Sequence, residues 1–175
     1  MKQAVDNLYG NRIRVRVCGI CIQKDKILLI RHSGVGERGS LWAPPGGGVD
    51  FGESLKETLV REYKEETGLD IVVNDFLFVN EYLASPLHAI ELFFKVEITG
   101  GEMVKGTDPE MSADKQIIQE IRFWSFKEIA TQDSLFFHSI LRNSKDLVGL
   151  TGLKGFLPIF KLVMWIKKAL FLPLQ

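Results

Sequence analysis

In several segments of the first hundred residues, hydrophobic and polar side chains alternate, and alternation with a period of two is typical of β-strands. It predicts a first pair of strands at 12–22 and 26–31, joined by the polar turn QKDK. Further strand patterns occupy 71–83, 89–98 and 121–126. We therefore expect a protein in which strands dominate.

After Ser54, the spacing of hydrophobic residues changes to the period of a helix. Ser54 and Glu57 form a capping box in SLKE, and Gly68 suits the left-handed residue that ends a helix, so a helix is predicted over 54–67. The same box in SFKE at 125–128 opens a second, short helix. Beyond it, SLFFHSILRNS predicts another apolar helix.

Segments rich in glycine, proline and charge separate these elements. HSGVGERGS, LWAPPGGGVDFG and GGEMVKGTDPEMSADKQ predict irregular loops. Since strands outnumber the helices interspersed among them, the expected fold class is α+β or an α/β sandwich. A length of 175 residues suits one domain, which we place at 1–146, followed by an extension at 147–175.

The composition narrows the classes of partner. Lys and Arg together number 22, as do Asp and Glu, so the formal net charge is zero. A balanced charge provides no overall field toward a nucleic acid polymer. No apolar run of signal-peptide length opens the chain, so we expect a cytoplasmic protein.

The two cysteines, Cys18 and Cys21, belong to the motif CGIC. A redox pair with this spacing usually opens a helix, and a zinc site would need a second pair, which the chain lacks. Inside a strand the two side chains face opposite sides of the sheet. We interpret them as two buried thiols in a reducing compartment, with redox or metal chemistry as the alternative.

The segment REYKEETG places three carboxylates, Glu62, Glu65 and Glu66, within five residues of the predicted helix. At about 100° per residue, Glu62 and Glu66 lie along the edge of the apolar stripe, and Glu65 lies next to Glu62. The expected stripe consists of Leu55, Leu59, Val60 and Tyr63. Carboxylates beside a buried stripe are costly unless a positive partner accompanies them.

Two explanations of these acids are open. A solvated acidic helix would pair them with Arg61 and Lys64, but both cations point away from Glu66. Several oxygens converging on one point instead suit a hard divalent cation. The turn PPGGGVDFGE upstream leaves carbonyl groups for a metal and N–H groups for phosphate, which points to a phosphate substrate bridged by Mg²⁺.

The same residues resemble the signature of the Nudix (MutT-like) hydrolase family, G-x5-E-x7-R-E-U-x-E-E-x-G-U, in which U is a bulky aliphatic residue. The matching positions are Gly47, Glu53, Arg61, Glu62, Glu65, Glu66, Gly68 and Leu69. Tyr63 stands at the first U position and departs in residue type, which should affect packing more than chemistry. WAPPGG before the motif also resembles the family, and the resemblance covers about 12–130.

This resemblance implies the Nudix fold, a mixed sheet between helices, and Mg²⁺-dependent hydrolysis of a nucleoside diphosphate linked to another moiety. Mn²⁺ is expected to replace Mg²⁺. The implied metal ligands are Glu62, Glu65 and Glu66, with the Gly47 carbonyl as an addition and Glu53 holding a further metal or its water. By the same resemblance, Arg61 orients the glutamates and Glu62 activates the attacking water.

Other residues are candidates for secondary roles. Some family members take the catalytic base from a later loop, so Glu110 and Glu120 are alternatives to Glu62, and solvated acids are the plainer interpretation of both. Arg38, in the GVGERGS loop, is a candidate phosphate contact or an ordinary solvated charge.

Aromatic residues and one proline bear on the substrate. Trp42, Phe123 and Trp124 are candidates for stacking on a base, although each also suits the core. Pro86 follows the motif after sixteen residues, which resembles a marker of ADP-ribose-type members. We favour ADP-ribose or a nucleotide sugar as substrate. The alternatives are a nucleoside triphosphate and a non-catalytic nucleotide-binding module of the same fold.

The end of the chain, GLTGLKGFLPIFKLVMWIKKALFLPLQ, is apolar, contains four lysines and has no acidic residue. Between Pro158 and Pro173, about 14 helical residues would span roughly 21 Å, too short for a bilayer of about 30 Å. A helix that is apolar around most of its circumference needs a cover. We expect packing on the domain or on a homodimer partner. The alternative is peripheral contact of 153–172 with an anionic membrane surface.

Overall fold

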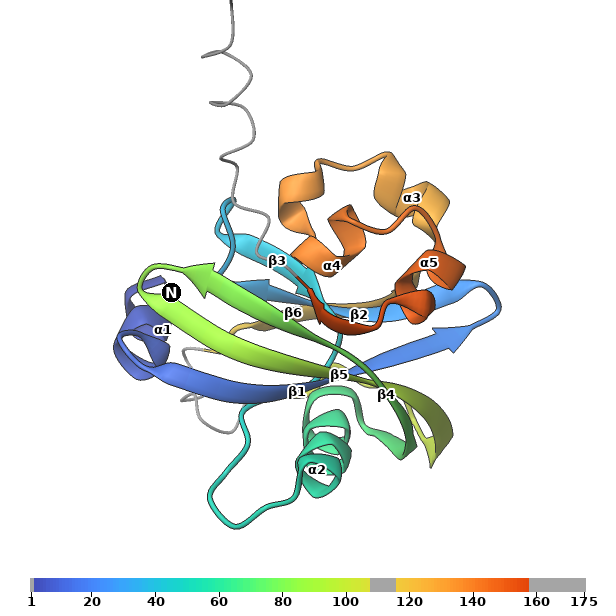
Figure 1. The fold of residues 1–175 in the computed structure, drawn as a ribbon, viewed down its shortest axis with the longest axis horizontal. Helices are drawn as coiled ribbons and strands as arrows, with labels where there is room; N and C mark the ends of the chain where they lie inside the picture. The colour runs from blue at the N-terminus through green and yellow to red at the C-terminus, as the bar shows by residue number, and fades with distance from the viewer. Residues whose placement is uncertain (1, 108–115, 158–175) are drawn as a thin grey trace, which may run out of the picture.

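The computed structural model describes residues 2–107 and 116–157, and within them seven strands form one mixed sheet (Figure 1). The strands are β1 (Ile13–Gln23), β2 (Lys26–Ser33), β3 (Ser40–Ala43), β4 (Leu69–Ala84), β5 (Leu87–Gly101), β6 (Ile118–Trp124) and β7 (Gly155–Leu157). Their order is β3–β2–β1–β5–β4–β7, and β6 pairs with β2. β1 runs parallel to β5 and β4 parallel to β7, while the other pairs are antiparallel.

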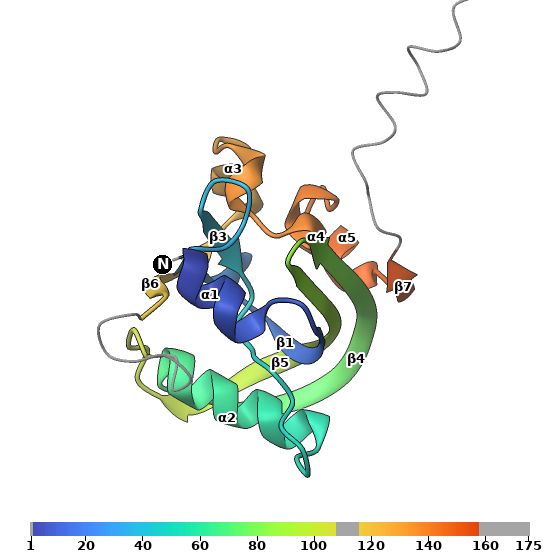
Figure 2. The same ribbon diagram turned by 90° about the vertical axis from the view of Figure 1, so that its left-hand side faces the viewer.

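Helices cover both faces of this sheet. They are α1 (Lys2–Tyr9), α2 (Leu55–Thr67), α3 (Phe126–Ala130), α4 (Ser139–Arg142) and α5 (Leu147–Gly152), with a 3-10 turn, η2 (Ser134–Phe136). α2 lies against one face, and α3, α4 and α5 gather over the other (Figure 2). Leu59 and Tyr63 of α2 belong to one buried cluster, and Ile129, Ile140 and Leu150 of α3–α5 belong to a second. The predicted α-β-α sandwich is therefore confirmed.

β1 contributes to both cores. Cys18 lies in the cluster under α3–α5, and Cys21 lies in the cluster under α2, so the two side chains face opposite sides of the sheet as predicted. Both thiols are buried and free. Burial raises the pKa of both, that of Cys21 to about 11, and so disfavours the thiolate that redox or metal chemistry requires.

The predicted ends of α2 are confirmed. The Ser54 hydroxyl accepts from the Glu57 N–H at 3.3 Å, and the Glu57 carboxylate accepts from the Ser54 N–H at 3.0 Å. Gly68 ends the helix at a φ of 72°, which costs glycine little. The second predicted box, between Ser125 and Glu128, opens α3 in the same way.

The buried stripe of α2 differs from the predicted one at one side. Val60 is 42% exposed, whereas Thr58, on the side of the helix that carries Glu62 and Glu65, is fully buried. The buried face is therefore turned toward the carboxylates, and Glu66 lies inside it with 6% exposure. The cost of burying these acids is larger than the sequence pattern indicates.

Two other predictions are corrected by long-range pairing. SLFFHSILRNS is not one helix, because Phe137 is extended and the N–H of His138 donates to the Trp42 carbonyl at 2.9 Å, which splits the segment into η2 and α4. Part of LWAPPGGGVDFG is a strand, since β3 pairs with β2.

The pattern also does not predict α1. This helix packs Val5 and Tyr9 against Ile117 in a small buried cluster of its own. Its burial depends on a residue more than a hundred positions away, which local periodicity does not reveal.

Residues 147–157 form α5 and β7 on the domain. Leu150 is fully buried, and Gly155 pairs with Phe78 of β4. The rest of the extension, 158–175, lies outside the described residues, so its apolar helix, its cover and the boundary at 146 stay predictions. In the part of the chain that the structure describes, no helix has the length and apolar character required to cross a membrane.

Tyr63, which stands where the family motif has an aliphatic residue, has a specific partner in β1. The Tyr63 hydroxyl donates to the Gly19 carbonyl at 2.7 Å, and a Cβ at Gly19 would lie 2.5 Å from the tyrosine ring. We expect Gly19→Ala to destabilise the protein by about 1–3 kcal/mol in urea unfolding, because the buried ring has little room to move. In a Tyr63→Leu background the same change should cost less than about 0.5 kcal/mol. Equal costs in both backgrounds would contradict this coupling.

Candidate active site

The glycine-rich segment before α2 is held along the edge of β1. Three backbone hydrogen bonds of 2.9–3.0 Å make this connection: Gly19 N–H to Pro45 O, Val17 N–H to Gly47 O, and Val49 N–H to Val15 O. A segment that looks irregular in sequence thus has a defined position, in which it meets the acidic side chains of α2.

Two consecutive glycines contact two glutamates. The N–H of Gly46 donates to Glu66 Oε2 at 2.8 Å. A Cβ at Gly47 would overlap the carboxylate of Glu62, so this position has no room for a side chain. The glycine that the motif requires at 47 therefore has a steric reason, which is the approach of the Glu62 carboxylate.

Arg61 contacts three of the four motif glutamates at once. Its Nε and Nη2 each donate to one oxygen of Glu53 at 3.0 Å, and its Nη1 donates to Glu62 at 3.0 Å and to Glu65 at 3.1 Å. Lys64 instead pairs with Asp70 at 2.8 Å. The structure thus brings Glu53, Glu62 and Glu65 of the motif together around one guanidinium.

Glu66 has a different environment. Besides Gly46, its carboxylate lies 3.6 Å from His32 Nε2, and its side chain is 8% exposed. The structure therefore agrees with the expectation that Arg61 and Lys64 point away from Glu66, since both form their ion pairs with other acids.

The acids differ in their electrostatics. Hydrogen bonds from Arg61, and then from Thr58, hold the pKa of Glu53 below its usual value. Burial, and then the charge of Glu66, raise the pKa of Glu62 to about 7. Glu62, which is partly buried, and Glu66, which is buried, thus repel one another, and a cation would relieve this repulsion.

A divalent cation fits this donor set chemically. Within residues 2–107 and 116–157, no three His, Cys, Asp or Glu side chains converge closely enough to hold an ion as they stand. Glu62 and Glu65 would need to turn from Arg61 to do so. Their oxygens are nevertheless hard donors on adjacent helical turns, and the Gly47 carbonyl, which accepts from Val17, has a second lone pair. The residues fit a metal that binds carboxylate oxygen.

The cluster borders a cleft of about 430 Å³. Glu53, Glu62, Glu65 and Glu66 line it on the side of α2. Residues that sequence reasoning missed line other parts of the same cleft, namely Val5, Tyr9, Arg14, Arg16, Tyr82, Ala89, Glu91 and His138. One signal was present in the sequence: Arg14 and Arg16 are charged residues at alternating positions of a predicted strand, and Glu91 stands between the apolar residues Ile90 and Leu92.

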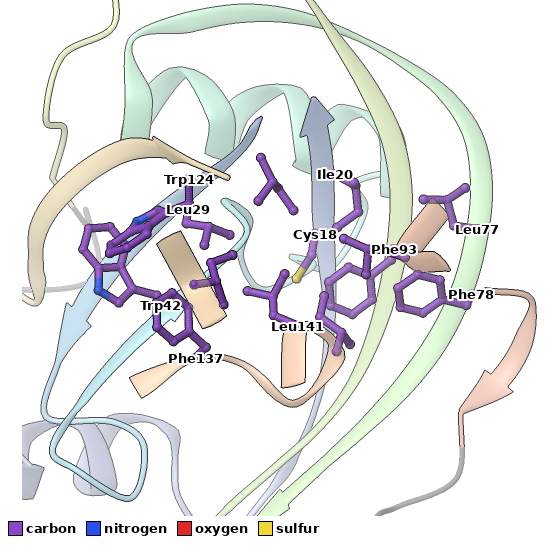
Figure 3. Close-up of a cluster of buried hydrophobic side chains, with 14 residues drawn as sticks. Cys18, Ile20, Leu29, Trp42, Leu77, Phe78, Phe93, Trp124, Phe137 and Leu141 are labelled. Carbon is purple, nitrogen blue, oxygen red and sulfur yellow. The ribbon is translucent and has the colours of Figure 1, made fainter. Parts of the chain in front are cut away.

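The remaining predicted residues lie elsewhere. Trp42 is 6% exposed and lies in the core beside Trp124 and Phe137 (Figure 3). Of the two roles considered for it, the core position rather than base stacking agrees with the structure. Arg38 pairs with Asp133 at 2.8 Å, and Glu120 pairs with Arg31 at 3.3 Å. None of the three candidates Trp42, Arg38 and Glu120 lines the cleft. Glu110 lies outside the described residues.

Comparison with known proteins places the chain in a family. The NUDIX domain family model matches residues 10–142. An ADP-ribose pyrophosphatase of Methanocaldococcus jannaschii is 40% identical over 99 residues, which cover 54% of this chain and 56% of that protein. The first three curated relatives are matched over 34–56% of their own lengths.

Solved structures of low sequence identity share the fold. A NUDIX hydrolase from Nitrosomonas europaea superposes with a TM-score of 0.61 at 19% identity, over 75% of this chain and 84% of that one. An ADP-ribose pyrophosphatase from Streptococcus suis 89-1591 gives a TM-score of 0.54 at 21% identity, over 82% of this chain and 97% of that one.

The raised pKa of Glu62 predicts that the free energy of unfolding of the metal-free protein depends on pH. Because the folded state retains a proton that the unfolded chain loses near pH 4.5, ionised Glu62 lowers stability progressively as the pH rises to about 7. In EDTA at pH 8, Glu62→Gln should therefore be more stable than the parent by about 1–3 kcal/mol, with the difference disappearing toward pH 4.

Urea unfolding between pH 4 and 8 measures this difference. Glu97→Gln removes the same charge at an exposed position and serves as the control. A Glu62→Gln protein that shows no gain at pH 8, or the same gain at every pH, would argue against a buried, repelled carboxylate at this position.

Proposed function

Because this chain belongs to the NUDIX domain family, we propose that it hydrolyses the pyrophosphate bond of a nucleoside diphosphate linked to another moiety. The observation that carries the proposal is the contact of Arg61 with Glu53, Glu62 and Glu65 at the border of the cleft. We favour ADP-ribose or a nucleotide sugar. The relative from Methanocaldococcus jannaschii, an ADP-ribose pyrophosphatase, supports this choice.

Glu62, Glu65 and Glu66 would hold Mg²⁺, with the Gly47 carbonyl and Glu53 as further ligands. When bound, the ion supplies positive charge for the oxygens on which negative charge develops during hydrolysis. Arg61 keeps the carboxylates of two helical turns and of the preceding loop at one place, and its hydrogen bonds keep Glu53 ionised.

Glu62 is the proton acceptor that we propose for the attacking water. It lines the cleft with a partly buried side chain beside Gly47, where its carboxylate can accept a proton. Glu120 lies at an exposed ion pair with Arg31, away from the cleft, which favours Glu62 over it.

Two other functions remain as alternatives. Hydrolysis of a nucleoside triphosphate would use the same acids with a different loop environment. A non-catalytic nucleotide-binding module of this fold typically lacks motif glutamates, and this chain has Glu53, Glu62, Glu65 and Glu66.

A substrate panel tests the proposed reaction. The full chain with Mg²⁺ is incubated with ADP-ribose, nucleotide sugars, diadenosine polyphosphates and nucleoside triphosphates. Phosphate is measured after alkaline phosphatase treatment for the first three, which resist that enzyme until they are cleaved, and after inorganic pyrophosphatase treatment for the triphosphates. We expect turnover of ADP-ribose or a nucleotide sugar, loss of turnover in excess EDTA, and its recovery with Mn²⁺. Full turnover in EDTA, or turnover of triphosphates alone, would contradict the proposal.

The ligand assignment is tested at two positions of α2. Glu65→Gln and Glu66→Gln each remove one charge and keep the side-chain shape, so kcat should fall by about 10²–10⁴-fold while unfolding by urea changes little. The exposed Glu97→Gln change should leave kcat unaltered. Near-parental Mg²⁺-dependent turnover by both variants would remove these residues from the site.

A further inference from the structure

Polar residues form a row across three neighbouring strands on one face of the sheet. Glu91 of β5 is opposite Arg16 of β1 on one side and opposite Asn80 of β4 on the other. The row two residues further along the same face is apolar, with Phe93 between Cys18 and Phe78 in the core (Figure 3). On this face of the sheet, the row of Phe93 thus belongs to the core, and the row of Glu91 borders the cleft.

Glu91 is buried, and its two neighbours contact only one of its two carboxylate oxygens. Its exposure is 6%, and Asn80 Nδ2 donates to its Oε2 at 2.9 Å. His138 Nε2 lies 3.0 Å from the same oxygen, at ion-pair distance although without the alignment of a hydrogen bond. Both neighbours therefore use Oε2, while the residue itself lines the cleft.

The charge of Glu91 is maintained by its surroundings. Burial alone would raise its pKa, but His138, Arg16 and Asn80 outweigh that effect and hold the pKa below its usual value. An ionised carboxylate accepts hydrogen bonds and donates none. Glu91 consequently presents an acceptor to whatever occupies this part of the cleft.

The next row toward the cleft has a small residue at its centre. Ala89 lies between Arg14 and Tyr82 in the register, and all three line the cleft. The Tyr82 ring is stacked on His138 at an angle of 24°, and the Arg14 guanidinium lies 4.0 Å from the centre of the Tyr9 ring. At this position the cleft is lined by the methyl group of Ala89, with planar side chains on both sides. Such a surface suits a planar ligand group.

We propose that Glu91 binds the nucleoside of the substrate over Ala89, accepting a hydrogen bond from an N–H or O–H group through its second carboxylate oxygen. This inference rests on the proposed function, which supplies the nucleoside. A phosphate does not suit the position, because it would bring a second negative charge to a buried carboxylate. The donor is therefore an N–H group of the base, which in adenine is the amino group, or a ribose hydroxyl.

A purely structural role is the competing explanation, since Glu91 also contacts His138 at the start of α4. Glu91→Gln separates the two roles. The glutamine oxygen can still accept from Asn80, and its amide N–H₂ then faces the cleft. An acceptor is thereby replaced by a donor while the contacts on the protein side are retained.

Calorimetric binding of AMP, IMP, 2′-deoxy-AMP and 3′-deoxy-AMP to the full chain with Mg²⁺ tests the proposal. The parent should bind AMP about tenfold or more tightly than the analogue that lacks the recognised donor, IMP if it is the base amino group and a deoxy compound if it is a hydroxyl. In Glu91→Gln that preference should disappear or reverse. Unchanged affinity ratios in this variant, or no preference in the parent, would overturn the proposal.

Ala89→Leu provides a second test that leaves the Glu91 contacts in place. It should weaken AMP binding about tenfold or more and raise the KM for ADP-ribose, with little change for base-free phosphoribosyl pyrophosphate. Equal effects on both compounds would place the nucleoside elsewhere. Because AMP binding needs no turnover, selective binding without hydrolysis would refute the proposed reaction alone, and hydrolysis without selectivity would refute this inference alone.

Discussion

The guanidinium of Arg61 is the interaction on which the site depends. Without it, Glu53, Glu62 and Glu65 would be three carboxylates gathered at one cleft with no positive group to offset their mutual repulsion. Arg61 is suited to this position because its planar group presents several donors in a fixed geometry, and it uses three nitrogens on three different acids. A lysine would offer one nitrogen and could not reproduce that set of contacts.

β1 is the element that gives this cluster its place in the fold. It contributes to both buried clusters, pairs with β5 from Ile13 to Cys21, and within that same stretch its residues Val15, Val17 and Gly19 hold the glycine-rich segment. Arg16, on the same strand, donates to the Gly46 carbonyl at 2.8 Å, and Gly46 in turn donates to Glu66. The acids of α2 and the polar row of Glu91 are thus connected through one strand.

The sequence predicted what local rules govern. Alternation located the strands, and side-chain capping together with Gly68 located α2 closely, since these signals act within a few residues. The motif identified the acids around Arg61. Burial of α1, the break at Phe137 and the contacts of Glu91 were not predictable in this way, because each depends on a residue distant in the chain. Trp42 shows the same limit, since an aromatic residue suits a core and a stacking surface equally well until its neighbours are known.

The short strand β7 has a consequence for association between chains. A sheet edge presents unpaired N–H and C=O groups to any other strand that reaches it. β7 covers the outer edge of β4 at Phe78, Val79 and Asn80, beside the row that contains Glu91. Strand addition at that stretch is therefore blocked by the chain itself, so a dimer that joined two sheets through β4 would first have to displace β7 and, with it, the buried Leu150 that precedes it.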